Sequence, residues 1–249
     1  MAPKTIEVRI LRQDGPAGAS RWEEFSLPYQ PNMNVISCLM EIQKHPVTRD
    51  GRTTSPPAWD QNCLENVCGS CSMLVNGRPV QACCTLVDRL SLPLELRPLT
   101  KFPLVRDLVV DRQRMFDLLR KVKAWVPIDG THDLGPGPGM AEVERAKAYE
   151  FSRCMTCGCC MEACPQFGPG NDFVGPAPIG QVRLFNAHPT GRMNQVERLQ
   201  TVMGKGGVSD CGNAQACVQV CPKKIPLLDA IAEVNRQVTG QWLRELFGG

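Results

Sequence analysis

Cysteine spacing constrains this chain more than any other feature of its sequence. The chain has 249 residues and 14 cysteines, and all but three of the cysteines fall into three spaced sets. The first set has four, two and eleven intervening residues: Cys63, Cys68, Cys71 and Cys83. The second set has two, two and three, followed by proline: Cys154, Cys157, Cys160 and Cys164. The third set repeats the second with one cysteine replaced: Cys211, Ala214, Cys217 and Cys221.

Each spacing is typical of one kind of iron-sulfur site. The x4-x2 hook with a distant fourth cysteine is typical of a plant-type 2Fe-2S site, and paired x2-x2-x3 runs are typical of two-cluster ferredoxins, in which the fourth cysteine of each run serves the other cluster. This crossover predicts a 4Fe-4S cluster on four thiolates: Cys154, Cys157, Cys160 and Cys221. The remaining three thiolates suit a 3Fe-4S cluster, because Ala214 replaces the ligand of the fourth iron: Cys164, Cys211 and Cys217.

Two other uses of cysteine fit the spacing less well. Structural zinc sites use closed sets of four ligands in two separated pairs, and neither the hook at Cys63 nor the evenly stepped runs has that form. A disulfide framework needs an oxidising compartment, and the opening residues lack the charged and apolar parts of a secretory leader. We therefore expect reduced thiols that are available for metal.

Three cysteines are expected not to be ligands. Cys84 adjoins Cys83, and neighbours on an extended strand point to opposite faces, so only one of them reaches the cluster. We predict Cys83, and this choice is the one that stays open. Cys159 interrupts the step that Cys160 completes, and Cys38 lies in a segment of helical pattern, where a free cysteine is usually a small buried hydrophobe.

Composition argues against several classes of function. Lys and Arg number 28 against 25 Asp and Glu, and the basic residues are scattered, which gives no nucleic-acid footprint. No stretch approaches the roughly 20 apolar residues of a spanning helix. No catalytic triad, P-loop or dinucleotide fingerprint is present, and the three histidines are far apart: His45, His132 and His188. We expect a chain that carries electrons, performs no bond chemistry and contacts a membrane only through a partner.

The first part of the chain, residues 1–105, has the pattern of a ferredoxin domain. Residues 5–12 and 21–27 alternate in polarity and predict a hairpin. Asn34 can cap a helix whose apolar stripe packs against the sheet. A second hairpin is expected at Asn76-Gly77, the strongest short hairpin signal.

That second hairpin delivers Cys83 to the cluster, and an alternating strand over residues 90–96 closes the domain. From residue 106 the apolar period becomes helical. We expect a helix over residues 108–125, a Gly and Pro loop over 127–140 and a helix leading into Cys154. Further helices are expected at 180–186, 194–203 and 227–239. The fold class is therefore α+β, with a β-grasp-like 2Fe-2S domain over 1–105 and a mainly helical bacterial-ferredoxin-type domain over 106–249.

Glycine and proline accompany the cysteines. Gly69, Gly158 and Gly212 would let backbone amides approach the sulfurs, although ordinary turn roles explain them equally well. The proline after Cys164 and after Cys221 fixes φ and lacks an amide hydrogen, which turns the chain away from the cluster.

The combined pattern resembles the iron-sulfur subunit of succinate dehydrogenase and fumarate reductase. The resemblance covers nearly the whole chain, and its most specific element is the order of three cluster sites with a substituted ligand at Ala214. Two further segments carry it: Lys101-Phe-Pro-Leu-Val-Arg-Asp-Leu-Val-Val-Asp111 and Gln181-Val-Arg-Leu-Phe-Asn-Ala-His-Pro-Thr-Gly191.

The resemblance implies a place in a respiratory complex. In that family the subunit lies between a flavoprotein, where succinate and fumarate interconvert at a covalently held FAD, and a membrane anchor that binds quinone. It implies that the 2Fe-2S site faces the flavin, that the 4Fe-4S site relays and that the 3Fe-4S site faces the quinone. It also implies a peripheral position at the cytoplasmic face of the bacterial cell membrane.

One departure concerns the quinone. Ubiquinone-linked members carry a tryptophan shortly after the first Cys-Pro and a histidine after the first cysteine of the last run, where this chain has Gly168-Pro169 and Gly212. In this respect the chain is similar to menaquinone-type bacterial enzymes with a single-chain dihaem cytochrome b anchor. The resemblance therefore implies menaquinone and haem b on the partner.

Two alternative functions remain. One is a free polyferredoxin or the electron-transfer subunit of a soluble dehydrogenase, although free ferredoxins are usually small and acidic and this chain is neither. The other is a zinc-stabilised binding module, which would be colourless. Co-purification with a flavoprotein and a haem-containing membrane protein would favour the respiratory complex over both.

Overall fold

The computed structural model describes residues 5–127 and 138–248. Contacts divide the chain into two compact units, and the first comprises Met1–Arg112 together with Met155–Glu162. The second comprises Gln113–Cys154 and Ala163–Gly249. A short segment of the second cysteine run thus belongs to the first unit. The domains expected from the sequence, 1–105 and 106–249, stay a prediction.

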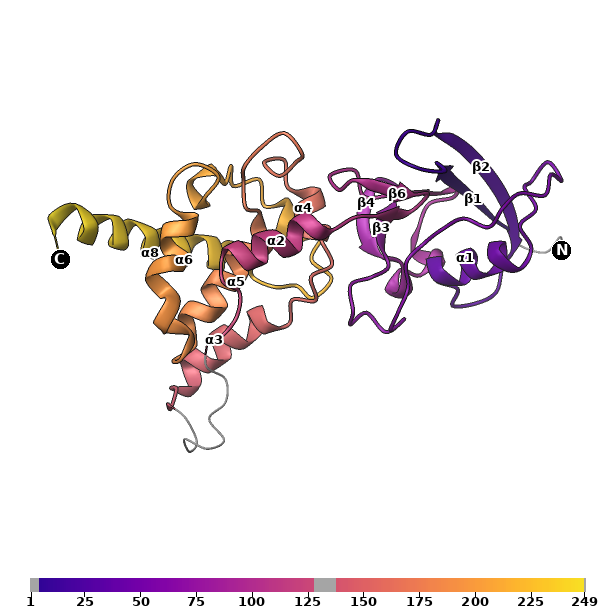
Figure 1. Ribbon diagram of the computed structural model, residues 1–249. Coiled ribbons are helices and arrows are strands. Elements are labelled where there is room, and N and C mark those ends of the chain that lie inside the picture. Colours follow the sequence, from indigo (N-terminus) through magenta and orange to yellow (C-terminus); the bar gives the residue numbers. More distant parts are fainter. Residues whose placement is uncertain (1–4, 128–137, 249) are drawn as a thin grey trace. The chain divides into compact units, whose positions relative to one another are not determined.

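A five-stranded sheet forms the first unit, with the strand order β2-β1-β5-β3-β4. Strand β1 pairs in parallel with β5, and the other pairs are antiparallel. Figure 1 labels four of these strands, β1 to β4, together with helix α1. Their bounds are β1 Thr5–Arg12, β2 Arg21–Pro28, α1 Val35–Lys44, β3 Ser72–Val75, β4 Arg78–Gln81 and β5 Leu94–Arg97.

The core of the first unit lies between the sheet and α1. The alternation in β1 buries every second residue, and the apolar stripe of α1 packs in the same cluster. The predicted cap is confirmed, because Ser37 N donates to Asn34 Oδ1 over 2.9 Å and the Ser37 hydroxyl lies 3.4 Å from Asn34 N as a capping box. Cys38 is fully buried in this helix, as predicted.

Both predicted hairpins are confirmed. Strand β1 pairs with β2 along its whole length, from Thr5 opposite Pro28 to Arg12 opposite Arg21. Between β3 and β4, Asn76 and Gly77 have φ of 49° and 77°. Two successive positive φ values are those of a type I′ turn, which matches the twist of the flanking strands.

The strand expected over residues 90–96 is wrong in its first half. Strand β5 begins only at Leu94, and the chain before it forms a 3-10 turn, η2, at Val87–Arg89. Leu92 is 45% exposed, and Pro93 after it has no amide hydrogen to donate to a neighbouring strand. Alternation of leucines alone was therefore a poor guide to this segment.

The helix expected over residues 108–125 starts later than predicted. Residues before it form a small hairpin of β6 (Leu104–Arg106) and β7 (Val109–Val110), and helix α2 spans only Gln113–Lys121. Asp107 at the turn has φ of 47° and is fully buried. Its long-range hydrogen bonds, described below, outweigh the local helical period.

The second unit is mainly helical. Figure 1 shows α3, α5, α6 and α8 grouped together, and α5 contacts each of the other three. Predicted helices before Cys154 and at 194–203 are confirmed, while α5 starts earlier and α8 continues well past residue 239. The bounds are α3 Glu142–Ser152, α5 Pro176–Ala187, α6 Gln195–Val202, α7 Ala216–Gln219 and α8 Leu227–Phe247. The short helix α4 (Cys159–Ala163) lies mostly in the first unit.

Helix α8 continues through Gly240 because its last turns have partners. Glu245 accepts a hydrogen bond from Gln241 one turn earlier and another from Gln200 of α6.

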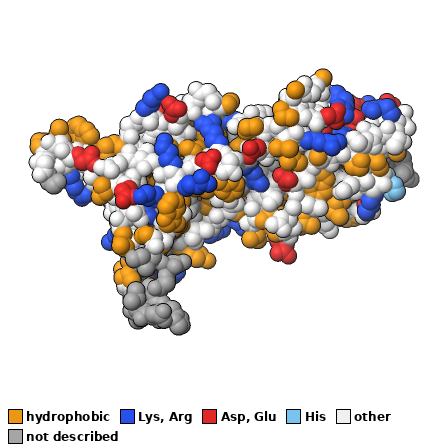
Figure 2. All heavy atoms as spheres, viewed as in Figure 1, with side chains coloured by type: hydrophobic (Ala, Val, Ile, Leu, Met, Phe, Trp, Pro, Cys, Tyr) orange, Lys and Arg blue, Asp and Glu red, His pale blue; other side chains and the backbone are white. Residues whose placement is uncertain are grey.

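None of the helices within residues 5–127 and 138–248 has both the length and the apolar content needed to cross a bilayer. On the face drawn in Figure 2, acidic and basic side chains are intermixed. Most of the Gly and Pro loop expected over 127–140 falls outside the described residues.

Candidate cluster-binding sites

Backbone amides surround the first two cysteines of the hook. Cys63 Sγ accepts hydrogen bonds from the amides of Glu65, Val67 and Cys68 at 3.3 to 3.4 Å. Cys68 Sγ accepts one from Ser70 N at 3.4 Å. These amides turn inward because the loop repeatedly enters the left-handed region, with positive φ at three residues: Leu64, Asn66 and Gly69. Amide donors of this kind stabilise negative charge on sulfur.

The two deeper cysteines of the first set lie beside each other. Cys71 and Cys83 are 3% and 7% exposed, and Ala82 N donates to Cys71 O over 3.1 Å. Cys84 is exposed, and its Sγ donates to the carbonyl of Gln81. The extended strand assumed for this pair is wrong, because residues Ala82–Cys84 form a 3-10 turn, η1. Cys83 is nevertheless buried while Cys84 is exposed, as expected if only Cys83 is a ligand.

Burial and hydrogen bonding act on the thiols in opposite directions. Burial tends to raise the pKa of Cys68, but hydrogen bonds from Cys63 and Ser70 outweigh it and lower the pKa to about 6. Burial raises the pKa of Cys71 to about 12; the Cys83 backbone opposes the rise and the Cys83 side chain adds to it. Iron bound at these sulfurs would favour their thiolate forms, because a coordinating thiol is deprotonated.

Part of the second cysteine run packs against the hook. Gly69 has φ of 74°, and a Cβ at this position would lie 2.4 Å from Met155 O. Arg112 Nη1 donates to Gly69 O over 2.6 Å and lies 3.4 Å from Cys157 O. The glycine here is therefore required by close backbone approach as well as by φ. Gly158 also has a positive φ, of 83°.

Glu162 fastens the end of this segment. Its carboxylate is buried and accepts three hydrogen bonds at 2.7 to 3.0 Å, from Thr100 N, Thr100 Oγ1 and Lys101 N. No motif in the sequence marks Glu162 or its partners as part of a site. These hydrogen bonds depend on the tertiary fold, which brings residues about sixty positions apart into contact.

Cys157 and Cys160, two predicted ligands, are buried in this segment of the first unit. Cys159 is fully buried beside them. A hydrogen bond with the Cys159 side chain, followed by burial, raises the pKa of Cys157. Metal binding would release that proton, because a coordinating thiol is deprotonated.

The other predicted ligands of the 4Fe-4S site, Cys154 and Cys221, belong to the second unit. Cys154 lies just after α3, with its amide bonded to Phe151 O. Cys221 Sγ accepts a hydrogen bond from Ile225 N at 3.4 Å. Both side chains are half-buried.

The three thiols predicted for the 3Fe-4S cluster all lie in the second unit. Burial, and then the neighbouring Cys164 and Cys211, raise the pKa of Cys217, so these sulfurs act on one another electrostatically. Ala214 lies in an exposed loop between two left-handed residues, Asn213 and Gln215, with φ of 52° and 59°. A methyl group offers no ligand there.

A cavity of about 510 Å³ opens beside this loop. Polar residues of the loop line one side, and apolar residues of α8 line the other: Cys211, Asn213, Gln215, Leu228 and Ile231. Gly212 approaches the amide of Gln166, whose Nε2 would lie 2.8 Å from a Cβ at this position.

Within residues 5–127 and 138–248, no three His, Cys, Asp or Glu side chains are arranged to hold a single metal ion. The donor sets still fit iron-sulfur clusters, in which the cysteines are divided among two or more iron atoms and so, as a set, lie farther apart than the ligands of one ion. Thiolates are the ligands that such clusters prefer. The amides directed at Cys63, Cys68 and Cys221 supply the hydrogen bonds that thiolate sulfurs accept.

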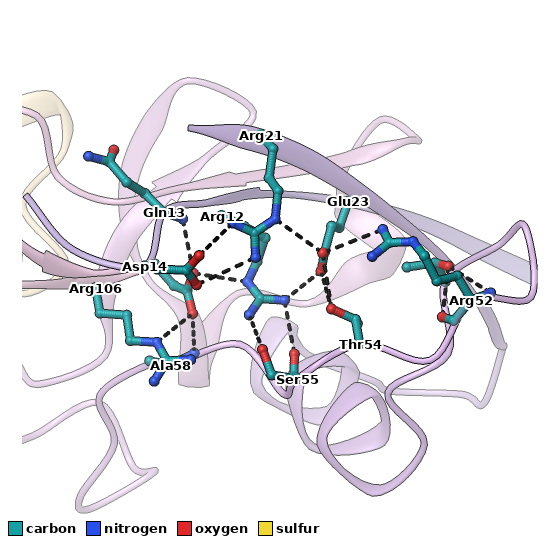
Figure 3. Close-up of polar contacts among 12 residues, drawn as sticks. Arg12, Gln13, Asp14, Arg21, Glu23, Arg52, Thr54, Ser55, Ala58 and Arg106 are labelled. Carbon is teal, nitrogen blue, oxygen red and sulfur yellow. Dashed lines mark hydrogen bonds and ion pairs between the residues drawn. The ribbon is translucent and has the colours of Figure 1, made fainter. Parts of the chain in front are cut away.

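A buried ion network, which the sequence did not indicate, supports the chain that leads to the hook. Arg12 is fully buried and donates to Glu23 Oε2 at 2.5 Å, Asp107 Oδ1 at 2.9 Å and Ser55 O at 3.0 Å. Figure 3 shows Arg12 between Glu23 on one side and Ser55 on another. Ala58 N donates to the second oxygen of Asp107. The segment just before Cys63 is thereby tied to β1.

The sites have counterparts in known proteins. Residues 7–117 match the model of a 2Fe-2S iron-sulfur cluster binding domain, and residues 150–225 match that of a 4Fe-4S dicluster domain. The chain is 58% identical over 245 residues to the succinate dehydrogenase iron-sulfur subunit of Bacillus subtilis, covering 98% of this chain and 97% of the relative. It is 31% identical over 241 residues to the fumarate reductase iron-sulfur subunit of Wolinella succinogenes, covering 94% and 98%.

A solved structure has the same fold. A chain of the Mycobacterium smegmatis Sdh1 complex in the apo form matches with a TM-score of 0.82 at 24% identity, covering 96% of this chain and 98% of that one. The α+β fold class, with a 2Fe-2S domain followed by a mainly helical dicluster domain, is confirmed. The prediction of 2Fe-2S and 4Fe-4S cofactors is confirmed by the same family models.

Proposed function

Because the chain belongs to the family of iron-sulfur subunits of succinate dehydrogenase and fumarate reductase, we propose that it carries electrons between a flavoprotein subunit and a membrane anchor. The observation that carries this proposal is the likeness to the Bacillus subtilis subunit at 58% identity over nearly the full length of both chains. Iron-sulfur clusters supply one-electron chemistry at potentials that the protein sets through charge, hydrogen bonds and burial. The residues of this chain hold, space and insulate those clusters.

The 2Fe-2S site is held by the first cysteine set, and its members differ in their surroundings. Cys63 and Cys68 lie in the amide-rich hook, whereas Cys71 and Cys83 are buried at the base of the β3–β4 hairpin. The preference for Cys83 over Cys84 is supported by burial of Cys83 and by its effect on Cys71. The complete set is Cys63, Cys68, Cys71 and Cys83.

The two helical-domain sites follow the crossover rule. The 4Fe-4S cluster is held by Cys154, Cys157, Cys160 and Cys221. The 3Fe-4S cluster is held by Cys164, Cys211 and Cys217, with Ala214 at the position of the absent ligand. Support for the second set is that all three thiols lie in one unit and that two of them raise the pKa of the third.

The partners follow from the family. A flavoprotein with FAD faces the 2Fe-2S site, and a cytochrome b anchor with haem b and menaquinone faces the 3Fe-4S site. The chain then lies at the cytoplasmic face of the bacterial membrane, held there by the anchor. Gly168 and Gly212 lie at positions where ubiquinone-linked relatives carry tryptophan and histidine. This difference supports menaquinone as the electron acceptor or donor.

Isolation of the native complex tests this function. We expect the chain to co-purify with a flavoprotein and a haem-containing membrane protein, and the complex to interconvert succinate and fumarate with a menaquinone analogue. Electron paramagnetic resonance (EPR) during a redox titration should resolve three centres, one of them an oxidised-state 3Fe-4S signal. A lone brown protein in the soluble fraction would instead indicate a free carrier, and a colourless one a zinc module.

A further inference from the structure

Two buried polar side chains face each other at the base of the β3–β4 hairpin. Ser72 on β3 is paired in register with Gln81 on β4, and their exposed fractions are 6% and 1%. Burying an amide costs free energy unless it is hydrogen-bonded, so these side chains need partners. Ser72 follows Cys71 directly, and Gln81 stands two positions before Cys83.

The Gln81 amide reaches both cysteine segments of the first unit. Cys71 Sγ lies 3.5 Å from Gln81 Oε1, and Gln81 Nε2 donates to Ser72 Oγ over 2.5 Å. Nε2 also lies 3.6 Å from Cys159 Sγ. Ser72 Oγ donates onward to Cys157 O over 2.7 Å. The amide therefore stands between one predicted ligand of the 2Fe-2S site and the backbone of one predicted ligand of the 4Fe-4S site.

The direction of these hydrogen bonds depends on the protonation of Cys71. With a protonated thiol, Cys71 donates to Oε1. A thiolate has no proton to donate, so Oε1 would face the lone pairs of a negatively charged sulfur. Half a turn about the terminal bond of Gln81 exchanges its oxygen and nitrogen at almost no change in shape, and it directs an N–H to the thiolate.

The neighbouring groups remain satisfied after this exchange. Gln81 Oε1 then accepts from the Ser72 hydroxyl. The carbonyls of Gly69 and Cys157 keep Arg112 Nη1 as a donor, at 2.6 and 3.4 Å. Leucine of similar size would pack in this site without any of these bonds, so packing does not explain a carboxamide here.

We propose that Gln81 is a positioning residue that donates a side-chain N–H to the Cys71 thiolate of the loaded protein and thereby raises the reduction potential of the 2Fe-2S site. The proposal rests on the assignment of Cys71 as a ligand under the proposed function. Reduction adds one electron to the site and leaves every covalent bond in place. A donor directed at a ligand sulfur favours this more negative state.

The test compares the native complex with a Gln81→Met variant, which keeps the length of the side chain and removes the N–H. EPR-monitored titration should give a lower midpoint potential for the 2Fe-2S centre at an unchanged cluster content. A Gln241→Met variant makes the same chemical change at a buried glutamine of the second unit, and its 2Fe-2S potential should stay at the wild-type value.

A labelling measurement tests the contact directly. In complex grown with side-chain ¹⁵N-glutamine, electron-nuclear double resonance (ENDOR) of the reduced 2Fe-2S centre should show a ¹⁵N coupling that Gln81→Met removes. If the variant fails to assemble, the wild-type spectrum alone decides, because a missing ¹⁵N coupling would overturn the proposal. An unchanged potential in a fully loaded Gln81→Met complex would also overturn it. Absence of any 2Fe-2S signal from the wild-type complex would instead contradict the proposed function.

Discussion

Arg12 and Asp107 form an ion pair in which both side chains are fully buried, although they are 95 positions apart in the sequence. Arg12 Nε lies 2.9 Å from Asp107 Oδ1. Arg106, which is partly exposed, also pairs with Asp107. Two other partly exposed arginines, Arg21 and Arg52, pair with Glu23, the second carboxylate bonded to Arg12. The pair joins the end of β1 to the β6–β7 turn and, through Ala58 N, to the segment that precedes Cys63.

Asp107→Asn should destabilise the protein by about 3 kcal/mol, because removal of one partner leaves a buried charge poorly compensated. Asparagine tolerates the left-handed φ of this position. Both carboxylate oxygens accept N–H hydrogen bonds, so the measured loss includes at least one hydrogen bond in addition to the charge. Thermal and denaturant unfolding of the purified chain measure the loss. Asp117→Asn, at an exposed carboxylate of α2, should cost less than about 0.5 kcal/mol. Equal effects of the two substitutions would show that the buried pair contributes nothing specific.

Gly69→Ala should prevent the hook from closing on residues 155–157. Alanine at a positive φ costs about 1 kcal/mol, and its Cβ would also lie 2.4 Å from Met155 O. Gly51→Ala is the matched control, because Gly51 has φ of 85° with nothing within 4 Å of a Cβ. We expect loss of 2Fe-2S content, measured by iron analysis and EPR, for the first variant alone. A fully loaded Gly69→Ala protein would argue against the close approach.

Cys83→Ser should abolish or shift the 2Fe-2S signal, whereas Cys84→Ser should leave it unchanged. The reason is that Cys83 is buried beside Cys71 while Cys84 is exposed and bonded to the backbone of Gln81. EPR of the reduced complex makes the comparison. The opposite outcome would place Cys84 at the cluster and require the η1 turn to shift by one residue.

Ala214→Cys should let the third site take up a fourth iron, because it restores the x2-x2-x3 spacing with a thiolate at the open corner. The oxidised 3Fe-4S signal should fall, and quinone turnover should slow while reduction of a flavin-side artificial acceptor is spared. Ala214→Ser, which has similar size and no thiol, is the control and should keep the signal. If Ala214→Cys keeps an unaltered signal and normal quinone kinetics, position 214 does not face the missing corner.

The sequence alone predicts the number, type and order of the clusters, because ligand identity and spacing are local properties of the chain. The same holds for the Asn34 cap and the Asn76-Gly77 turn, which depend on a few neighbouring residues. Local patterns also predicted α3, α6 and the first residue of α8, whereas α5 begins earlier and α8 ends later than predicted. The predictions were partly wrong in two segments. Over residues 90–96 the leucines alternate but the strand begins only at Leu94, and over residues 108–125 the apolar period is helical but the helix begins only at Gln113.

Only the tertiary structure decided which side chains surround the cysteines. Gln81, Ser72 and Glu162 belong to no recognisable motif, and their contacts join residues roughly ten to eighty positions apart. Nor did the sequence indicate that Arg12 would be buried, since a lone arginine at the end of a strand is ordinarily solvated. A buried polar group is stabilised by partners that the fold brings to it, and short-range sequence patterns carry no information about those partners.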